Sequence, residues 1–317
     1  MAKASLTQKI IYAPLAALLH GIALLPFGAL YRIADVLYVL MFYVLRYRKK
    51  VVIKNLNECF PDKSESERQQ IMKDFYKHLA DTFVETIKLL HVSDEEMRRR
   101  IVFHDVEEVD KSIANGRSVV MYAAHYCNWE WLSAITMWSR YDTSVMQFGQ
   151  VYHPLSNAWW NDFMLNLRGR FKSHSYPMKR VLRDLLAAKN KGKVSITGFI
   201  SDQHPHPNDI DDVITFLNHH TAFITGPETM AKRIDMDVLY FDVRKVKRGY
   251  YDCTIRVISR TPKDEPQYKI TNTYARMLEQ AIIESPAEWL WTHKRWKRPV
   301  TPKNTNSNEQ TDSCNNS

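Results

Sequence analysis

A histidine and a glutamate, His125 and Glu130, lie five residues apart. A carboxylate that holds an imidazole fixes its tautomer, and it stabilises the imidazolium that forms when the histidine takes a proton. The two side chains could therefore act as a general base and its orienting partner. On one continuous helix they would point in directions about 140° apart, so the backbone between them must be of another kind.

The residues on either side of His125 predict a passage from a strand to a helix. A turn at 115–117 precedes an apolar, β-branched run that predicts a buried strand over 119–124, and the residues after Asn128 have helical spacing. We expect Asn128 to be the helix N-cap and Glu130 to lie in the first turn, where the helix end favours a carboxylate. Such a turn can bring the two side chains together. The spacing alone favours the alternative, a strand-end histidine bonded to backbone and a solvated glutamate.

Other segments of the chain alternate between strand and helix patterns. Strands are predicted at 101–105, 119–124, 144–152, 194–200, 238–245 and 251–259, and helices at 62–96, 106–114, 129–140, 155–170, 178–188, 223–234 and 268–285. This alternation predicts an α/β fold with a mainly parallel central sheet flanked by helices. Ligands bind beyond the carboxyl ends of parallel strands. Since His125, Tyr152 and Asp202 each follow a strand, we expect them to line one cleft.

Two arginines, Arg168 and Arg170, lie at the end of the helix predicted at 155–170. Their forked donors suit a phosphate, an acyl carbonyl or the oxyanion of a reaction intermediate, and a solvated pair at a helix end is the alternative. Asp202 could organise an arginine, bind a substrate or cap the next loop. Histidines at 204, 206, 219 and 220 lack the spacing of a metal site, so we expect no metal. Cys127 is interpreted as a small core residue at the turn.

The composition narrows the classes of partner. The 317 residues are 45% hydrophobic and carry 44 Lys and Arg against 35 Asp and Glu, a net charge of +9. That charge suits an anionic membrane surface or an acidic protein, and because no nucleic-acid module is recognisable we expect no nucleic acid. The four cysteines have no paired spacing and predict free thiols in a reducing compartment. No Gly-x-Ser-x-Gly motif or phosphate-binding glycine loop is present.

The first 50 residues predict a membrane anchor. Residues 10–31 contain no Asp, Glu, Lys or Arg and are long enough to span a bilayer, although Pro14 and Pro26 interrupt them. One interpretation is a transmembrane helix with the basic cluster 46–50 on the cytoplasmic side, and the other is a helical hairpin in one leaflet. A cleaved signal peptide is the least favoured alternative. We expect a main domain at 51–300 and a disordered, Asn- and Ser-rich tail at 301–317.

Several motifs occur in order between about residue 10 and residue 299. They are Arg46-Tyr47-Arg48-Lys49 with Asn55-Leu56 and Phe60-Pro61, His125 to Glu130, Tyr152-His153-Pro154 with Asn157, Arg168-Gly169-Arg170, Asp202-Gln203, and Trp289 to Lys297. Together they resemble the lipid A biosynthesis acyltransferases of the lauroyl/myristoyl transferase type, within the wider glycerolipid acyltransferases. The resemblance implies that the main domain at 51–300 is an acyltransferase domain.

The resemblance also implies roles for individual residues. In that family the His-x4-Asp/Glu pair is the catalytic dyad, which implies that His125 is the general base and Glu130 its partner. We place the substrate-binding site at Asn128, Tyr152, Arg168, Arg170, Asp202 and Gln203. The implied donor is acyl-acyl carrier protein, the acceptor is a hydroxyl of a lipid A precursor, and no cofactor is expected. The implied location is the cytoplasmic side of the bacterial inner membrane, with Trp289, Trp291 and Trp296 at the headgroup level.

The chain departs from the family where the acceptor would bind. His153 stands where better-known members usually have arginine, and 203–207 replaces an acidic or glycine-rich loop. These differences do not affect the chemistry of the dyad, but they leave the identity of the acceptor open. The alternatives are an acyltransferase that acts on a lysophospholipid or an aminolipid, a non-catalytic membrane protein that binds acyl chains, and a thioesterase in which water replaces the lipid hydroxyl.

Overall fold

The computed structural model describes residues 3–142, 144–298 and 300, so the tail predicted at 301–317 lies outside the described residues. One sheet has the strand order β1-β9-β8-β2-β5-β3-β4, and β6 pairs with β7 in a separate hairpin. All neighbours in the large sheet are parallel except β8 and β9. The strands are β1 (Ile101–His104), β2 (Val119–Ala123), β3 (Met146–Tyr152), β4 (His174–Pro177), β5 (Val194–Ile200), β6 (Val213–Phe216), β7 (His219–Ala222), β8 (Asp237–Lys247) and β9 (Tyr250–Ser259).

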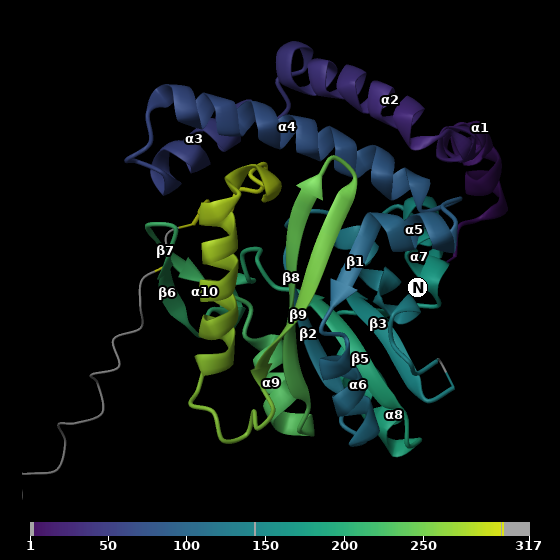
Figure 1. Ribbon diagram of the computed structural model, residues 1–317, viewed down its shortest axis with the longest axis vertical. Helices are drawn as coiled ribbons and strands as arrows, with labels where there is room; N and C mark the ends of the chain where they lie inside the picture. The colour runs from purple at the N-terminus through teal and green to yellow at the C-terminus, as the bar shows by residue number, and fades with distance from the viewer. Residues whose placement is uncertain (1–2, 143, 299, 301–317) are drawn as a thin grey trace, which may run out of the picture.

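Helices cover the sheet and one end of it (Figure 1). The α-helices are α1 (Leu6–Leu24), α2 (Phe27–Val39), α3 (Lys49–Cys59), α4 (Glu65–Lys88), α5 (Asp94–Arg100), α6 (Glu107–Ala114), α7 (Ala158–Arg168), α8 (Val181–Asn190), α9 (Gly226–Ile234) and α10 (Lys269–Glu284). The π-helix η1 (Leu40–Val44) continues α2, and the short 3-10 helices are η2 (Trp129–Met137), η3 (Gly169–Phe171), η4 (Pro207–Asp209) and η5 (Pro286–Glu288). The predicted α/β fold with a mainly parallel sheet is confirmed.

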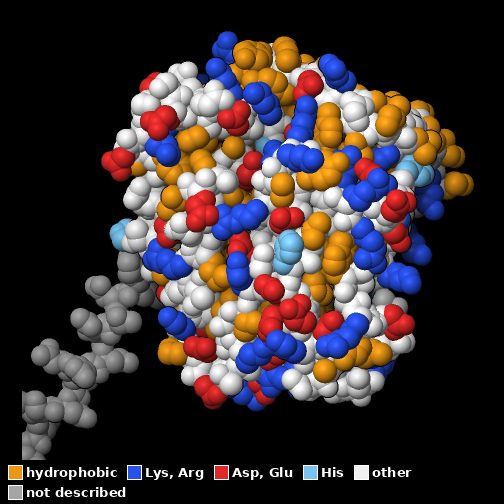
Figure 2. Space-filling model, in the orientation of Figure 1, with side chains coloured by type: hydrophobic (Ala, Val, Ile, Leu, Met, Phe, Trp, Pro, Cys, Tyr) orange, Lys and Arg blue, Asp and Glu red, His pale blue; other side chains and the backbone are white. Residues whose placement is uncertain are grey.

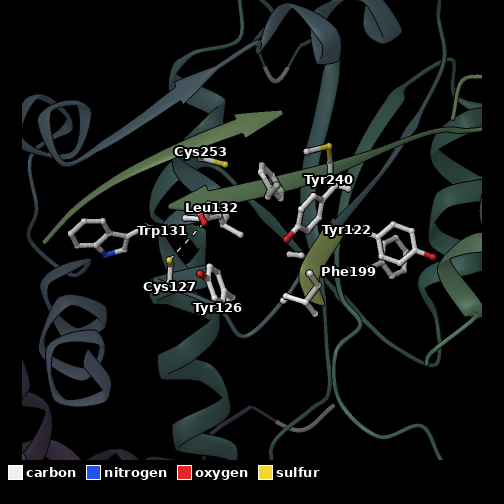
Figure 3. Packing of buried hydrophobic residues seen from close by; sticks show 14 of the residues in the cluster. Tyr122, Tyr126, Cys127, Trp131, Leu132, Phe199, Tyr240 and Cys253 are labelled. Carbon is white, nitrogen blue, oxygen red and sulfur yellow. Dashed lines mark hydrogen bonds between the residues drawn. The ribbon is translucent and has the colours of Figure 1, made fainter. Parts of the chain in front are cut away.

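Strand β2 lies at the centre of the core, between β8 and β5. All five of its residues are buried, which explains why its sequence is apolar without alternation. Tyr122 of β2 stacks on Tyr274 of α10, with ring centroids 4.5 Å apart. Figure 3 shows Tyr122, Tyr240 and Phe199, from the three neighbouring strands, among the packed side chains of this core.

The apolar N-terminal stretch is divided into two helices at Leu25-Pro26. Pro26 has no N–H to continue α1, and its fixed φ of −64° places it at the N-cap of α2. In the part of the chain that the structure describes, one segment, Phe27–Val44, is long and apolar enough to cross a membrane. The stretch predicted at 10–31 is therefore not one continuous helix. Figure 1 shows α4 across the end of the sheet at which β8 terminates, with α1 and α2 on its outer side.

Candidate active site

The turn that follows β2 is held by a segment from the end of the chain. Cys127 has a left-handed backbone with a φ of 51°, which reverses the chain after His125. The backbone N–H of Cys127 donates to the Glu288 carbonyl at 2.9 Å, and that of Leu290 donates to the His125 carbonyl at 3.1 Å. Tyr126 and Trp289 thus form an antiparallel bridge. Both ends of the turn are fixed, so the position of the His125 side chain is defined by the fold.

The carboxylate that holds the His125 ring is Asp202. Its Oδ1 accepts from His125 Nδ1 at 2.8 Å, while its Oδ2 accepts the His125 backbone N–H at 3.1 Å and the Trp289 indole N–H at 2.9 Å. The Asp202 side chain is 3% exposed and the imidazole 21% exposed. Because Nδ1–H donates to the carboxylate, Nε2 keeps its lone pair. The amide nitrogen of Gln203 lies 3.4 Å from this Nε2.

The surroundings of Asp202 favour its charged form. Burial alone would raise the pKa of this carboxyl, but the adjacent His125 imidazole and the Trp289 and His125 N–H donors lower the pKa below its ordinary value. Asp202 is therefore a carboxylate at neutral pH. A buried carboxylate on Nδ1 stabilises the imidazolium that forms when Nε2 takes a proton.

Glu130 lies in a second group, with Arg168. Arg168 donates from Nε to Glu130 Oε2 at 2.9 Å and from Nη2 to Oε1 at 2.6 Å, a two-pronged pair. The predicted contact between Glu130 and His125 is not formed among the hydrogen bonds of the site. Each of the two side chains instead contacts a residue from another part of the chain. Asp202, after β5, reaches the imidazole, and Arg168, at the end of α7, reaches the glutamate. The helix that begins at Trp129 is a 3-10 helix rather than the expected α-helix, and Asp202 already occupies His125 Nδ1.

Asn128 occupies the N-cap position of η2, as predicted, but its side chain does not form the capping hydrogen bond expected there. Its side chain makes no capping hydrogen bond and is fully buried, and its Nδ2 donates to Glu85 Oε2 at 2.7 Å. The hydroxyls of Tyr251 and Tyr31 donate to the same carboxylate at 2.9 Å and 3.0 Å. Asn128 therefore ties the turn to α4.

Of the other predicted site residues, Gln203 contacts the His125 imidazole, whereas Tyr152 and Arg170 interact with other groups. Gln203 faces His125 directly. Tyr152 ends β3 and helps to raise the pKa of Arg168 against the opposing effect of burial. Arg170 donates instead to the Val92 carbonyl at 2.9 Å and to Asp94 at 2.6 Å, so it fastens η3 to the start of α5.

Sequence reasoning missed a clamp behind the turn. His78 of α4 places Nδ1 2.9 Å from Glu288 and Nε2 3.2 Å from the Cys127 carbonyl. Lys245 lies 3.6 Å from the same glutamate. No spacing pattern in the sequence predicts this clamp, because its residues come from three separate elements, α4, β8 and η5.

Trp289 and Trp291, predicted at the headgroup level, are instead 3% and 0% exposed within the core. Trp289 donates its indole N–H to Asp202, as described above. The resemblance had marked the segment 289–297 without giving Trp289 this role. The prediction of these two side chains at the membrane surface is therefore wrong.

Cys127 is unsuited to act as a nucleophile. Burial, reinforced by Glu288, raises the pKa of its thiol well above the ordinary value, so the thiolate is not populated at neutral pH. Cys59, Cys127 and Cys253 are all buried free thiols. Their burial fits the interpretation of Cys127 as a core residue, and Figure 3 shows Cys127 packed near Tyr126 and Trp131.

The Trp289→Phe variant is expected to lose about 1–3 kcal/mol of unfolding free energy, because the buried Asp202 carboxylate loses a donor. We also expect kcat to fall while KM changes less than twofold. Urea denaturation and steady-state kinetics measure the two effects. Trp291→Phe is the matched control, since its indole donates to the neutral Pro286 carbonyl; equal losses of stability and activity in both variants would contradict the role given to Trp289.

The contribution of Asp202 to stability is expected to depend on pH. An unfolded aspartate titrates near about 3.9, and the folded pKa is lower. The stabilisation is therefore fully present above the unfolded pKa and is lost as the pH falls through the folded pKa. The gap between the unfolding free energies of the protein and of Asp202→Asn, measured from pH 7 to 3, should be constant at neutral pH and should narrow as the pH falls below about 4. A gap that widens in acid would contradict this sign.

The fold and the site define a class: an α/β protein with a carboxylate-held histidine at the carboxyl end of its central strand. Comparison with known proteins identifies the group within that class. The model of the bacterial lipid A biosynthesis acyltransferase family matches residues 3–298. The chain therefore belongs to the bacterial lipid A biosynthesis acyltransferase family.

Individual relatives support this assignment. The chain is 24% identical over 286 residues to a lipid A biosynthesis lauroyltransferase of Escherichia coli (strain K12), which covers 86% of this chain and 87% of the relative. It is also 24% identical over 260 residues to a lipid A biosynthesis palmitoleoyltransferase of the same organism, covering 81% of each. The predicted enzyme class, an O-acyltransferase, agrees with the family description and with these names.

Proposed function

We propose that the protein transfers a fatty acyl chain from acyl-acyl carrier protein to a hydroxyl of a lipid A precursor, on the cytoplasmic side of the inner membrane. The observation that carries the proposal is the His125–Asp202 pair, in which Nδ1 is engaged at 2.8 Å and Nε2 is left to take a proton. Family membership supports acyl transfer. The names of the relatives support a lipid A acceptor.

In the proposed reaction, His125 Nε2 removes the proton of the acceptor hydroxyl as its oxygen attacks the thioester carbonyl. A new C–O bond forms in a tetrahedral intermediate, after which the C–S bond breaks and the departing thiolate takes the proton from the imidazolium. Asp202 stabilises the imidazolium throughout. Because the thioester is already activated, this route requires neither a covalent acyl-enzyme nor a cofactor.

Arg168 is the proposed electrostatic group of the site. Glu130 engages Nε and Nη2, and no hydrogen bond of Nη1 is found among the described residues, so Nη1 is the proposed donor to an oxyanion or to a phosphate of the substrate. Glu130 thereby keeps a role in the site by orienting Arg168. Its position in the His-x4-Glu motif is compatible with this assignment, although the family resemblance implied a contact with His125.

The charge of the chain supports the proposed donor. The net charge is +9, and an acyl carrier protein is acidic, so attraction would favour encounter. Basic segments at 189–193, 244–248 and 294–298 are the candidate contacts. Raised salt should weaken this encounter.

The test is acyl transfer from an acyl carrier protein loaded with a labelled fatty acid. The purified full chain is given a lipid A precursor, a lysophospholipid or an aminolipid in separate reactions, and mass spectrometry measures acylated lipid and free fatty acid. Label in the lipid A precursor is the expected result. Preferential acylation of another lipid would overturn the acceptor, release of free acid alone would indicate a thioesterase, and binding without turnover would overturn the enzyme assignment.

A further inference from the structure

The two N-terminal helices and η1 expose an unusually apolar surface, which we call the N-terminal apolar face. Its side chains are between 41% and 74% exposed. They are Leu6, Ile10, Ile11, Leu18, Leu24, Val36, Val39, Leu40, Tyr43, Val44 and Leu45. Figure 2 shows hydrophobic side chains gathered along the upper edge and upper right of the molecule, over α2 and α1 of Figure 1. A contiguous exposed surface of this kind marks a site of interaction.

The charges around this face indicate which kind of surface covers it. Residues 1–57 contain eight lysines and arginines and a single acidic residue, Asp35. The positive side chains of Lys9, Arg32, Arg46 and Lys50 are exposed. Apolar side chains rimmed by lysine and arginine fit the interface of an anionic bilayer, where each basic residue adds attraction.

A series of hydrogen bonds holds these helices along α4. Lys88 donates to the Ala23 and Leu25 carbonyls, both at 2.8 Å, and so fixes the end of α1. One turn earlier on α4, Glu85 accepts from the Tyr31 hydroxyl of α2 at 3.0 Å. Detaching either helix would leave polar groups of α4 without these partners.

An ion-pair cluster fixes the middle of α2 in the same way. Arg248, in the turn between β8 and β9, lies 2.7 Å from Asp35 of α2 and 2.6 Å from Asp81 of α4. Asp35 is near the centre of Phe27–Val44, the segment long enough to span a bilayer. Phe27 and Phe42, near the two ends of that segment, are buried in the core of the main domain.

These contacts conflict with a spanning helix. If Phe27–Val44 crossed the bilayer as it stands, Arg248 and its two carboxylates would be carried into hydrocarbon, where buried charges are costly. If it left the domain to cross alone, the ion pairs and the buried aromatic contacts would be lost. A helix that lies in the interface keeps every one of these contacts and still covers the apolar face.

We propose that the N-terminal apolar face docks on an anionic phospholipid bilayer, with α1 and α2 lying in the interface and neither of them crossing it. This proposal refines the membrane association that is part of the proposed function. It does not depend on the proposed acyl transfer, because membrane binding is measured without acyl donor or acceptor. The face adjoins the end of the sheet that holds His125: Glu85 bonds both Tyr31 of α2 and Asn128 of the turn. Docking therefore brings the carboxyl edge of the sheet to the lipid surface.

The first test measures binding of the full chain to sedimented vesicles, without substrate. Vesicles of phosphatidylcholine with about one third phosphatidylglycerol should bind at least about tenfold more tightly than phosphatidylcholine alone. Ile10→Glu with Val44→Glu should reduce binding at least about tenfold, since both side chains would enter the apolar interface. Leu186→Glu on α8 is the control, at an apolar position that is also exposed, though less so at 37%, and lies away from this face. Equal binding of all three proteins would overturn the proposal.

The second test separates docking from spanning. Asp35→Cys and Arg248→Cys are combined with Cys314→Ser, since the other three cysteines are buried. A short bifunctional thiol reagent should join the two introduced thiols equally well in free and vesicle-bound protein. Asp35→Cys with Lys263→Cys, on the loop after β9, is the negative control. Cross-linking that disappears on vesicles would show that α2 leaves the domain, and would overturn the in-plane arrangement even if the protein still bound and still transferred acyl chains.

Discussion

The His125→Ala protein is expected to transfer acyl chains about 10³-fold more slowly than the unmodified protein, within the range that general acid–base catalysis supplies. The reason is that Nε2 is the proposed proton acceptor and the ring is held by Asp202, with Nδ1 2.8 Å from Oδ1. The measurement is kcat/KM with a labelled acyl-acyl carrier protein and lipid acceptor. The loss should lie in kcat, because the imidazole acts on the reacting hydroxyl.

The control is His104→Ala, which removes a half-exposed histidine beside Asp252 at the end of β1. It should retain normal kinetics. Both variants should bind anionic vesicles as the unmodified protein does, so that a loss of activity is not a loss of membrane contact. A His125→Ala protein with more than half of the normal rate would contradict the assignment of the base.

The second large effect is expected for Asp202→Asn. The amide keeps much of the shape but does not hold Nδ1–H as a carboxylate does, so the tautomer and the imidazolium lose their support. The same change in a serine-protease triad lowers kcat by about 10⁴, and we expect a loss of about 10²- to 10⁴-fold here. Because the pKa of Asp202 is lowered, Asp202 stays charged at neutral pH, and its own titration is not expected to limit activity there.

Glu130→Gln is the variant that separates the structural assignment from the dyad implied by the sequence motif. The structure places Glu130 on Arg168, with bonds of 2.9 Å and 2.6 Å. A glutamine keeps one acceptor for the guanidinium, so the loss in kcat/KM should be smaller than that of Asp202→Asn and should resemble that of Arg168→Lys. If Glu130→Gln were the more damaging change and Arg168→Lys were nearly normal, the dyad of the motif would be supported instead.

The sequence contained the signals for the position of His125 but lacked those for its partner. The apolar run at 119–124 and the helical spacing after it were enough to place the histidine beyond a buried strand. Its contact with Asp202 depends on strand order and register: β2 pairs with β5 so that Ala123 lies beside Ile200, and the residues two further along each strand are His125 and Asp202. Sequence patterns locate strands, but they do not state which strands are neighbours.

The same limit explains the other differences. Arg168 was assigned to a phosphate or a carbonyl because its helix end was visible in the sequence, whereas its pair with Glu130 joins α7 to η2 across the sheet edge. Strand β4 was missed because it has four residues and gains its place by pairing with β3. The N-cap role of Asn128 rested on local preference, and the buried Glu85 of α4 outweighed that preference.

The bridge between Tyr126 and Trp289 has a consequence for how the protein becomes active during synthesis. The backbone that fixes the histidine turn, and the indole that holds Asp202, belong to residues translated long after the central strand. At about 5–20 residues per second the ribosome needs roughly ten seconds or more to reach them. If His125 and Asp202 act as proposed, the site is incomplete until these residues are made, and we expect truncation before residue 288 to reduce acyl transfer even though both side chains are still present.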